Sequence, residues 1–181
     1  MEFCLHYYGV LKSADNASGK HAIRKELHTQ IKSLCLSTVF ESAFNESKEP
    51  KNSLFIEHGS KRYWFLISEK LKTVLDVHIT LLVPHKVGSI INKGGDIDNR
   101  IKTLFDAMRA PSVASEIPKQ DDFDYQTEGG MYCLLQDDKL INRISVQSYQ
   151  DYSPESPNYV RCLIECKTRI TDAFWGNLNF V

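Results

Sequence analysis

The sequence predicts an α+β fold in which a mixed β-sheet is packed by two main helices. Alternating apolar residues in "TVLDVHITLLVP" and "YVRCLIECKTR" predict strands with one covered face. Two stretches, about 21–40 and 97–109, carry apolar residues at helical spacing and predict the helices. Because only two helices separate the strands, and strands follow one another at the end of the chain, α+β is favoured.

The N-terminal part is predicted to contain a strand, a helix and a hairpin. Residues 2–10 are predicted as a strand and residues 11–20 as a loop. The helix that follows carries one apolar stripe, formed by Ile23, Leu27, Ile31, Leu34, Cys35 and Val39. After a polar linker at 44–52, residues of about 53–67 are predicted as an inserted hairpin that turns at Gly59.

The later elements follow from the same two periodicities. The strand that ends at Pro84 covers Leu75, Val77, Ile79, Leu81 and Val83. The second helix has an apolar face made of Ile97, Ile101, Leu104, Phe105 and Met108. A strand at about 139–147 is predicted to point Leu140, Ile144 and Val146 inward. The last strand points Val160, Cys162, Ile164 and Cys166 inward.

Length and charge indicate one domain with a long acidic loop. The chain has 181 residues, which is enough for one sizeable core, so residues 1–181 are expected to form a single domain. Residues of about 110–130 form the long loop, and loops of this length are uncommon and often functional or mobile. The net charge of −1 is compatible with a DNA-facing surface but does not indicate one. Acids gather at Glu116, Asp121, Asp122, Asp124, Glu128, Asp137 and Asp138.

The cysteines and the hydropathy predict a cytoplasmic protein. The five cysteines are odd in number and scattered, without a C-x-x-C pair, which is typical of free thiols in a reducing compartment. No apolar run approaches the ~18 residues of a membrane span. The N-terminus lacks the basic and small-residue features of a signal peptide.

The stretch "GGDIDNRIKTLFDAM" places Asp96 and Asp98 at the start of the second helix. One interpretation is helix capping, with Asp98, Lys102 and Asp106 forming ion pairs at i,i+4 spacing. The other is a divalent metal site. A double glycine allows close approach to a ligand, and a second acidic pair in "LLQDDKL" is costly unless a cation lies between the charges. Carboxylate oxygens are the ligands that a hard divalent cation prefers.

Other metal sites are excluded by spacing. An EF-hand loop needs an acid or amide at its fifth position and glycine at its sixth, where this chain has Arg100 and Ile101. The six histidines show no H-x-x-x-H or H-E-x-x-H spacing for zinc.

These two acidic segments resemble the RusA family of Holliday junction resolvases. The family pattern, D-x-D-N-x-x-K-x-x-x-D-A-L followed later by D-D and a strand, is matched by both segments, with a methionine in place of the final leucine. The matching residues are Asp96, Asp98, Asn99, Lys102, Asp106, Ala107, Asp137 and Asp138. The match covers about 25 residues directly, while the hairpin and the long acidic interval depart from the pattern.

The resemblance implies a homodimeric, metal-dependent endonuclease that acts on branched DNA such as four-way junctions. It implies that Asp96, Asp98 and Asp138 hold Mg²⁺, or Mn²⁺, and that Lys102 lies beside the scissile phosphate. Asn99, Asp106 and Asp137 would be supporting residues. Basic residues that flank the motifs are predicted to contact DNA phosphates: Lys86, Lys93, Arg100, Lys139 and Arg143.

The sequence is also compatible with two alternatives. One is a catalytically idle RusA-like module that binds DNA, or that binds a protein partner through the acidic loop at 110–130. The other is a nuclease that keeps the metal site but acts on other branched DNA or on RNA.

Overall fold

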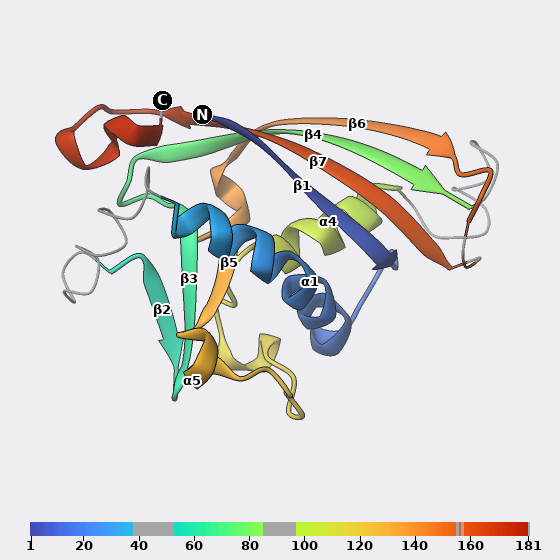
Figure 1. Cartoon of the computed structure of the whole chain (residues 1–181), viewed down its shortest axis with the longest axis horizontal. Helices are drawn as coiled ribbons and strands as arrows, with labels where there is room; N and C mark the ends of the chain where they lie inside the picture. Colours follow the sequence, from blue (N-terminus) through green and yellow to red (C-terminus); the bar gives the residue numbers. More distant parts are fainter. Residues whose placement is uncertain (38–52, 85–96, 155, 157, 181) are drawn as a thin grey trace.

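The computed structural model describes residues 1–37, 53–84, 97–154, 156 and 158–180. These residues form an α+β fold with two sheets and few helices (Figure 1). The strands are β1 (Glu2–Val10), β2 (Phe55–His58), β3 (Lys61–Ile67), β4 (Thr73–Val83), β5 (Met131–Leu135), β6 (Ile141–Gln150) and β7 (Tyr159–Ile170). The α-helices are α1 (Ala17–Cys35), α4 (Ile97–Met108) and α5 (Tyr125–Glu128), and the 3₁₀-helices are η2 (Ala114–Glu116), η3 (Asp138–Leu140) and η4 (Trp175–Phe180).

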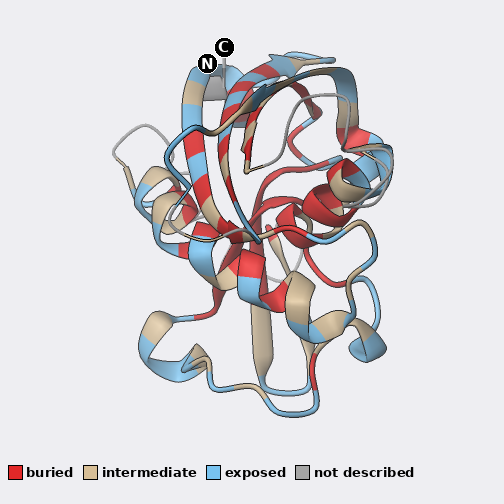
Figure 2. Cartoon of the chain, turned by 90° about the vertical axis from the view of Figure 1, so that its right-hand side faces the viewer, coloured by how far each residue is buried: buried red, intermediate tan, exposed pale blue. Residues whose placement is uncertain are grey.

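The larger sheet is mixed, as the sequence predicts. Its strand order is β1-β7-β4-β6, with β7 antiparallel to both neighbours and β4 parallel to β6. All the residues predicted to lie on the covered faces of β4 and β7 are buried. The helices α1 and α4 lie on that one side of the sheet (Figure 1), and the buried residues gather between them and the strands (Figure 2).

A side chain of α1 covers the outer edge of β1. The amide nitrogen of Gln30 donates to the carbonyl of His6 at 2.8 Å, and the Gln30 side-chain oxygen accepts from the His6 N–H at 3.0 Å. One glutamine therefore occupies both backbone hydrogen-bonding groups that an added strand would use at this position.

The predicted hairpin exists but belongs to a second sheet that the sequence did not predict. β2 and β3 are antiparallel and turn at Gly59, whose φ is +64°. β3 also pairs in parallel with β5, opposing Tyr63 to Met131. The expectation of one sheet was wrong because β5 is buried along its whole length, so "MYCLL" lacks the alternation that identifies a half-exposed strand. The hairpin is part of the hydrophobic core rather than a surface addition.

The two main helices have the predicted apolar faces. α1 begins at Ala17, inside the predicted loop, because the Asn16 side chain caps it by accepting from the Gly19 N–H at 3.0 Å. Four residues of its predicted stripe are buried: Ile23, Leu27, Ile31 and Cys35. Leu34 is partly buried, whereas Val39 and the linker at 44–52 lie outside the described residues. On α4, Ile101, Leu104, Phe105 and Met108 are buried and Ile97 is partly buried.

The predicted burial of the strand after the acidic pair holds only in part. Leu140 is buried, but it lies in η3 rather than in a strand. Ile144 is 52% exposed, which corrects its predicted inward position. Among the described strands β6 pairs only with β4, so it forms a sheet edge where the covering layer ends.

Two adjacent glycines provide a matched stability test. Gly129 has φ +73°, and a Cβ added there would meet no atom within 4 Å, whereas Gly130 has φ +117° and an added Cβ would lie 2.9 Å from Trp64 Nε1. Gly129→Ala is expected to cost about 1 kcal/mol from the left-handed backbone alone. Gly130→Ala adds a steric clash, so its loss of unfolding free energy in urea denaturation is expected to be about twice as large. Equal losses in the two variants would contradict this.

All five cysteines are free thiols, and four of them are buried. No helix in the described part of the chain is both long enough and apolar enough to cross a membrane.

Candidate active site

The first half of α4 presents the matched polar residues to solvent. Asp98, Asn99 and Lys102 are all exposed. The Asp98 carboxylate accepts a hydrogen bond from the Asn99 N–H at 2.8 Å, a contact that stabilises the start of the helix. Asp96, Lys86 and Lys93 lie outside the described residues.

Asp106, two turns further along α4, is held by cations. Its side chain is only 14% exposed, and its Oδ2 lies 2.6 Å from Lys20 Nζ on α1. Its Oδ1 lies 3.6 Å from Arg109 Nε. The sequence predicts that Asp106 pairs with Lys102 on the same helix. In the structure Asp106 pairs with Lys20, which lies on α1.

Backbone pairing brings the second acidic motif to the C-terminal end of α4. Arg109 forms an isolated parallel bridge with Leu135, the last residue of β5, and the Ala110 N–H donates to the Leu135 carbonyl at 2.8 Å. Asp137 and Asp138 follow directly. Asp137 caps η3 by accepting from the Lys139 N–H at 3.0 Å. The C-terminal end of the first motif segment therefore lies beside the second segment, although the two are distant in sequence.

The electrostatics of Asp138 are consistent with this proximity. Asp138 is exposed, yet partial desolvation raises its pKa, and a hydrogen bond with the Asp137 carboxyl and the negative charges of Asp137 and Asp106 raise that pKa further, while Arg109 acts in the opposite direction. A carboxyl in this position holds its proton more tightly than an isolated aspartate, and a cation that replaced the proton would relieve the repulsion.

Asp98 and Asp138 lie toward opposite ends of α4. Eight residues separate Asp98 from Asp106, or ~12 Å along a helix. Contacts with the larger sheet agree with this separation. Arg100, near the start of α4, lines the same cavity as Pro84, at the end of β4. Ile141, just after η3, pairs with Leu75 near the start of β4. The described residues contain no group of three His, Cys, Asp or Glu side chains that could hold a metal ion.

The three described residues predicted to contact DNA do not form one surface. Lys139 is ion-paired with Glu69 at 2.7 Å. Arg100 is half-buried in a cavity of about 890 Å³, beside Tyr159 and Val160 at the start of β7. Arg143 lines another cavity, next to the opposite end of β7.

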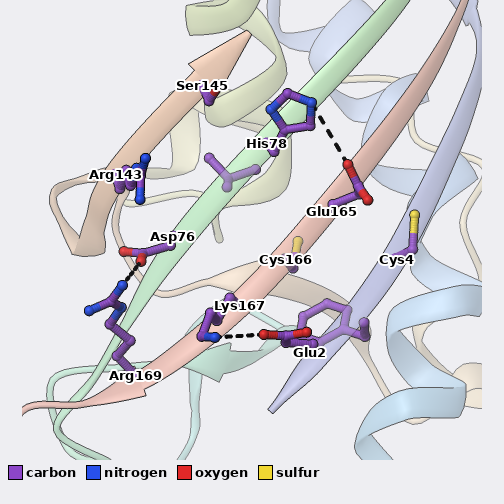
Figure 3. Close-up of a pocket in the computed structure, with 12 residues that line it drawn as sticks. Glu2, Cys4, Asp76, His78, Arg143, Ser145, Glu165, Cys166, Lys167 and Arg169 are labelled. Carbon is purple, nitrogen blue, oxygen red and sulfur yellow. Dashed lines mark hydrogen bonds and ion pairs between the residues drawn. The ribbon is translucent and has the colours of Figure 1, made fainter.

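The cavity at Arg143 lies on the uncovered face of the larger sheet and has a volume of about 670 Å³ (Figure 3). Ion pairs join Arg169 to Asp76 at 2.6 Å and Lys167 to Glu2 at 2.6 Å, and His78 Nε2 lies 3.8 Å from Glu165 Oε2. Its lining carries three cationic residues, Arg143, Lys167 and Arg169, and three acidic ones, Glu2, Asp76 and Glu165. These balanced charges give the cavity no positive excess that would attract a phosphate.

The acidic segment 110–130 is attached to the body of the protein. Glu116 accepts two hydrogen bonds from the Arg109 guanidinium, and although burial opposes it, this contact and the Ser112 N–H lower the pKa of Glu116 to about 2. Asp122 pairs with Lys25 at 2.6 Å and Glu128 with Lys32 at 2.6 Å. These acids are therefore neutralised within the chain, so they present less negative charge to DNA than the sequence suggests.

The basic residues of α1 that contact the acidic segment share a helical spacing, which could have identified them from the sequence. His21, Lys25, His28 and Lys32 are separated by four, three and four residues on α1. This is a helical stripe like the apolar one beside it. A second, polar stripe on a helix indicates a second contact surface, and here that surface meets the acidic segment.

Comparisons with known proteins gave no match to the chain, whether among family models, curated proteins or solved structures.

Proposed function

We propose that the protein is a Mg²⁺-dependent, structure-selective DNA endonuclease of the RusA type that nicks four-way junctions. The observation that carries this proposal is the pairing of Arg109 and Ala110 with Leu135, which sets the end of the D-x-D-N-x-x-K-x-x-x-D-A segment beside the D-D segment. This contact between the end of one motif and the start of the other, across a long intervening segment, is what supports the proposal.

The donor chemistry at the acidic pair fits a hard cation. Mg²⁺ is commonly held by one or two carboxylates together with substrate phosphates and water, so a three-carboxylate cage is not required. Asp138 would hold the ion in place of its proton, with Asp137 and Asp106 close enough for their negative charges to act on it. When bound, the ion supplies an acidified water and stabilises charge on the phosphoryl oxygens.

The remaining matched residues would bind and orient DNA along α4. Lys102 is exposed between Asp98 and Asp106 and offers a positive charge to a backbone phosphate. Asn99 and Asp98 stabilise the helix start through the contact between them. Asp98 at this end, together with Asp96 two residues earlier in the sequence, would serve a second cation position, because the length of the helix keeps Asp98 apart from Asp138.

We further propose a homodimer in the cytoplasm, since a two-fold dimer matches the symmetry of a four-way junction. Each subunit would then nick one of two opposed strands. This part rests on the family resemblance and on symmetry.

The test is a nicking assay on a labelled four-way junction with purified protein. We expect paired nicks with Mg²⁺ or Mn²⁺, none with EDTA, and stronger competition from unlabelled junction than from duplex, flap or RNA. Competition by flap or RNA above that by junction would reassign the substrate. A lack of cleavage at any Mg²⁺ or Mn²⁺ concentration would refute the endonuclease.

A catalytically idle binding module is the second candidate. It is favoured by the ion pairs that already neutralise Asp106 without a metal. It predicts junction binding that is insensitive to EDTA and unaccompanied by nicking, which the same assay detects alongside a gel-shift measurement.

A further inference from the structure

Two histidines of α1 hold the acidic segment through their neutral forms. His28 is 5% exposed at its side chain, and its ring makes an edge-on contact with Phe123 at 4.9 Å. Its Nδ1 accepts a hydrogen bond from the Tyr132 N–H at 2.9 Å, and its Nε2 lies 3.1 Å from Glu128 Oε2. Because Nδ1 is an acceptor, the proton of the neutral ring is on Nε2, where it is donated to Glu128.

A second proton on His28 has no place in this arrangement. It would bind Nδ1 and point at the Tyr132 N–H, so that two donors would face each other at 2.9 Å. The bond that fixes the start of β5 to α1 would break, and Tyr132 would lose the acceptor for its buried N–H.

His21, seven residues earlier on the same helix, meets the other end of the segment. Its side chain is 3% exposed, and its Nε2 lies 2.9 Å from Asp121 Oδ1. Asp121 is itself 2% exposed at its side chain and also accepts from Lys61 and from the Tyr125 hydroxyl. The Nδ1 of His21 is buried and has no hydrogen-bond partner among the described atoms, so a proton placed there would also be unsatisfied.

The charges around the two rings do not compensate for burial. Burial lowers the pKa of His28 below its ordinary value of 6.5, with Glu128 acting to raise it and Lys32 to lower it. Burial likewise lowers the pKa of His21, with Asp121 raising it and Arg24 and Lys25 lowering it. The unfolded chain binds these protons more tightly than the folded protein does. The contribution of the two histidines to stability is therefore present above pH 6.5, their ordinary pKa, and is lost as the pH falls through their folded-state pKa values.

We propose that His21 and His28 form a pH-sensitive latch that holds residues 121–130 against α1 when both rings are neutral and releases them in mildly acidic solution. This device is independent of the nuclease proposal. The released segment connects to Glu116, which holds Arg109 beside Asp106 and the end of β5, so release would loosen the surroundings of the acidic pair.

Trp64 supplies a reporter for the test, because its indole N–H donates to the Gly129 carbonyl at 2.9 Å inside the latched region. In a Trp175→Phe background, which removes the exposed second tryptophan, Trp64 emission is followed from pH 8 to pH 5 together with far-UV circular dichroism. We expect a reversible red shift of Trp64 emission while most of the dichroism is retained. Ring titrations by NMR are expected to show His28 and His21 gaining protons over the same pH range as the shift.

The variant that tests the mechanism is His21→Gln combined with His28→Gln, with His6→Gln, an exposed histidine on β1, as the matched control. The double variant is expected to lose the pH-dependent shift and the control to keep it. A shift that persists in the double variant, an unchanged wild-type spectrum down to pH 5, or a shift that coincides with global unfolding would each overturn the latch. If the double variant does not fold, the wild-type ring titrations decide: titration of both rings outside the pH range of the shift overturns the proposal.

Discussion

Asp138→Asn is expected to abolish junction cleavage while making the folded protein slightly more stable at neutral pH. The loss of activity follows from the proposed function, in which Asp138 holds the cation. We expect kcat to fall by at least about 100-fold, the size of loss found when a group that organises transition-state charge is removed. Junction binding, which depends mainly on phosphate contacts, should change little.

The gain in stability follows from the raised pKa of Asp138. A folded-state pKa above the unfolded value means that the ionised carboxylate is disfavoured in the fold. The contribution of this group to stability is therefore lost as the pH rises through the folded-state pKa. A neutral asparagine removes that disadvantage at pH 7, so the melting temperature measured without divalent cation should rise.

The cleavage rate and the melting temperature of Asp138→Asn together distinguish a metal-binding role of Asp138 from a structural role. Asp122→Asn is the matched control, because Asp122 is an exposed acid, 84% accessible at its side chain, that pairs with Lys25 far from the acidic pair in sequence. It should leave cleavage unchanged. An Asp138→Asn protein that cleaves at the wild-type rate would remove Asp138 from the site, and one that loses both activity and stability would identify a structural residue.

Arg24→Met is expected to produce the largest loss of stability. Arg24 is 2% exposed, and its guanidinium donates to the carbonyls of Asp106 at 3.0 Å and Arg109 at 3.3 Å. These carbonyls end α4, so the cation satisfies acceptors that the helix leaves unpaired and interacts with the negative end of its dipole. Methionine fills much of the volume but provides no donor. Leaving these two partly buried acceptors unpaired should cost about 3 kcal/mol.

The loss is measured by urea denaturation, as a shift of the midpoint at constant m-value. Lys25→Met, on the next residue of the same helix, is the control: its pair with Asp122 is at the surface, where solvent screens the two charges, so its midpoint should barely move. A loss in Arg24→Met no greater than in the control would show that the C-terminal end of α4 does not depend on this guanidinium.

The elements that the sequence predicted well are those with one covered face. On β4 and β7, alternation identifies the strand and the buried side together, because polar residues remain on the open face of the sheet. The same reasoning identified the buried stripes of α1 and α4. It failed at β5, where both faces are covered and the apolar run carries no period, so the second sheet was missed.

The candidate site was predictable in its residue types but not in its arrangement. Spacing within α4 places Asp98, Lys102 and Asp106 on one side of the helix, yet nothing in the sequence states which end of α4 meets the D-D segment. That depends on the pairing of Arg109 with Leu135. The partner of Asp106 was equally hidden, since Lys20 is 86 residues away and reaches it only because α1 packs on α4.

The two hydrogen bonds between the Gln30 side chain and the His6 backbone limit how the larger sheet can pair with a strand of another chain. Gln30 already fills the donor and acceptor of His6 on that side, so an incoming strand would have to displace a side chain that supplies both bonds. At the opposite edge of the sheet, β4 is the only described strand that pairs with β6. Growth of the sheet by intermolecular strand addition, whether in an assembly or in aggregation, is therefore directional and should begin at β6.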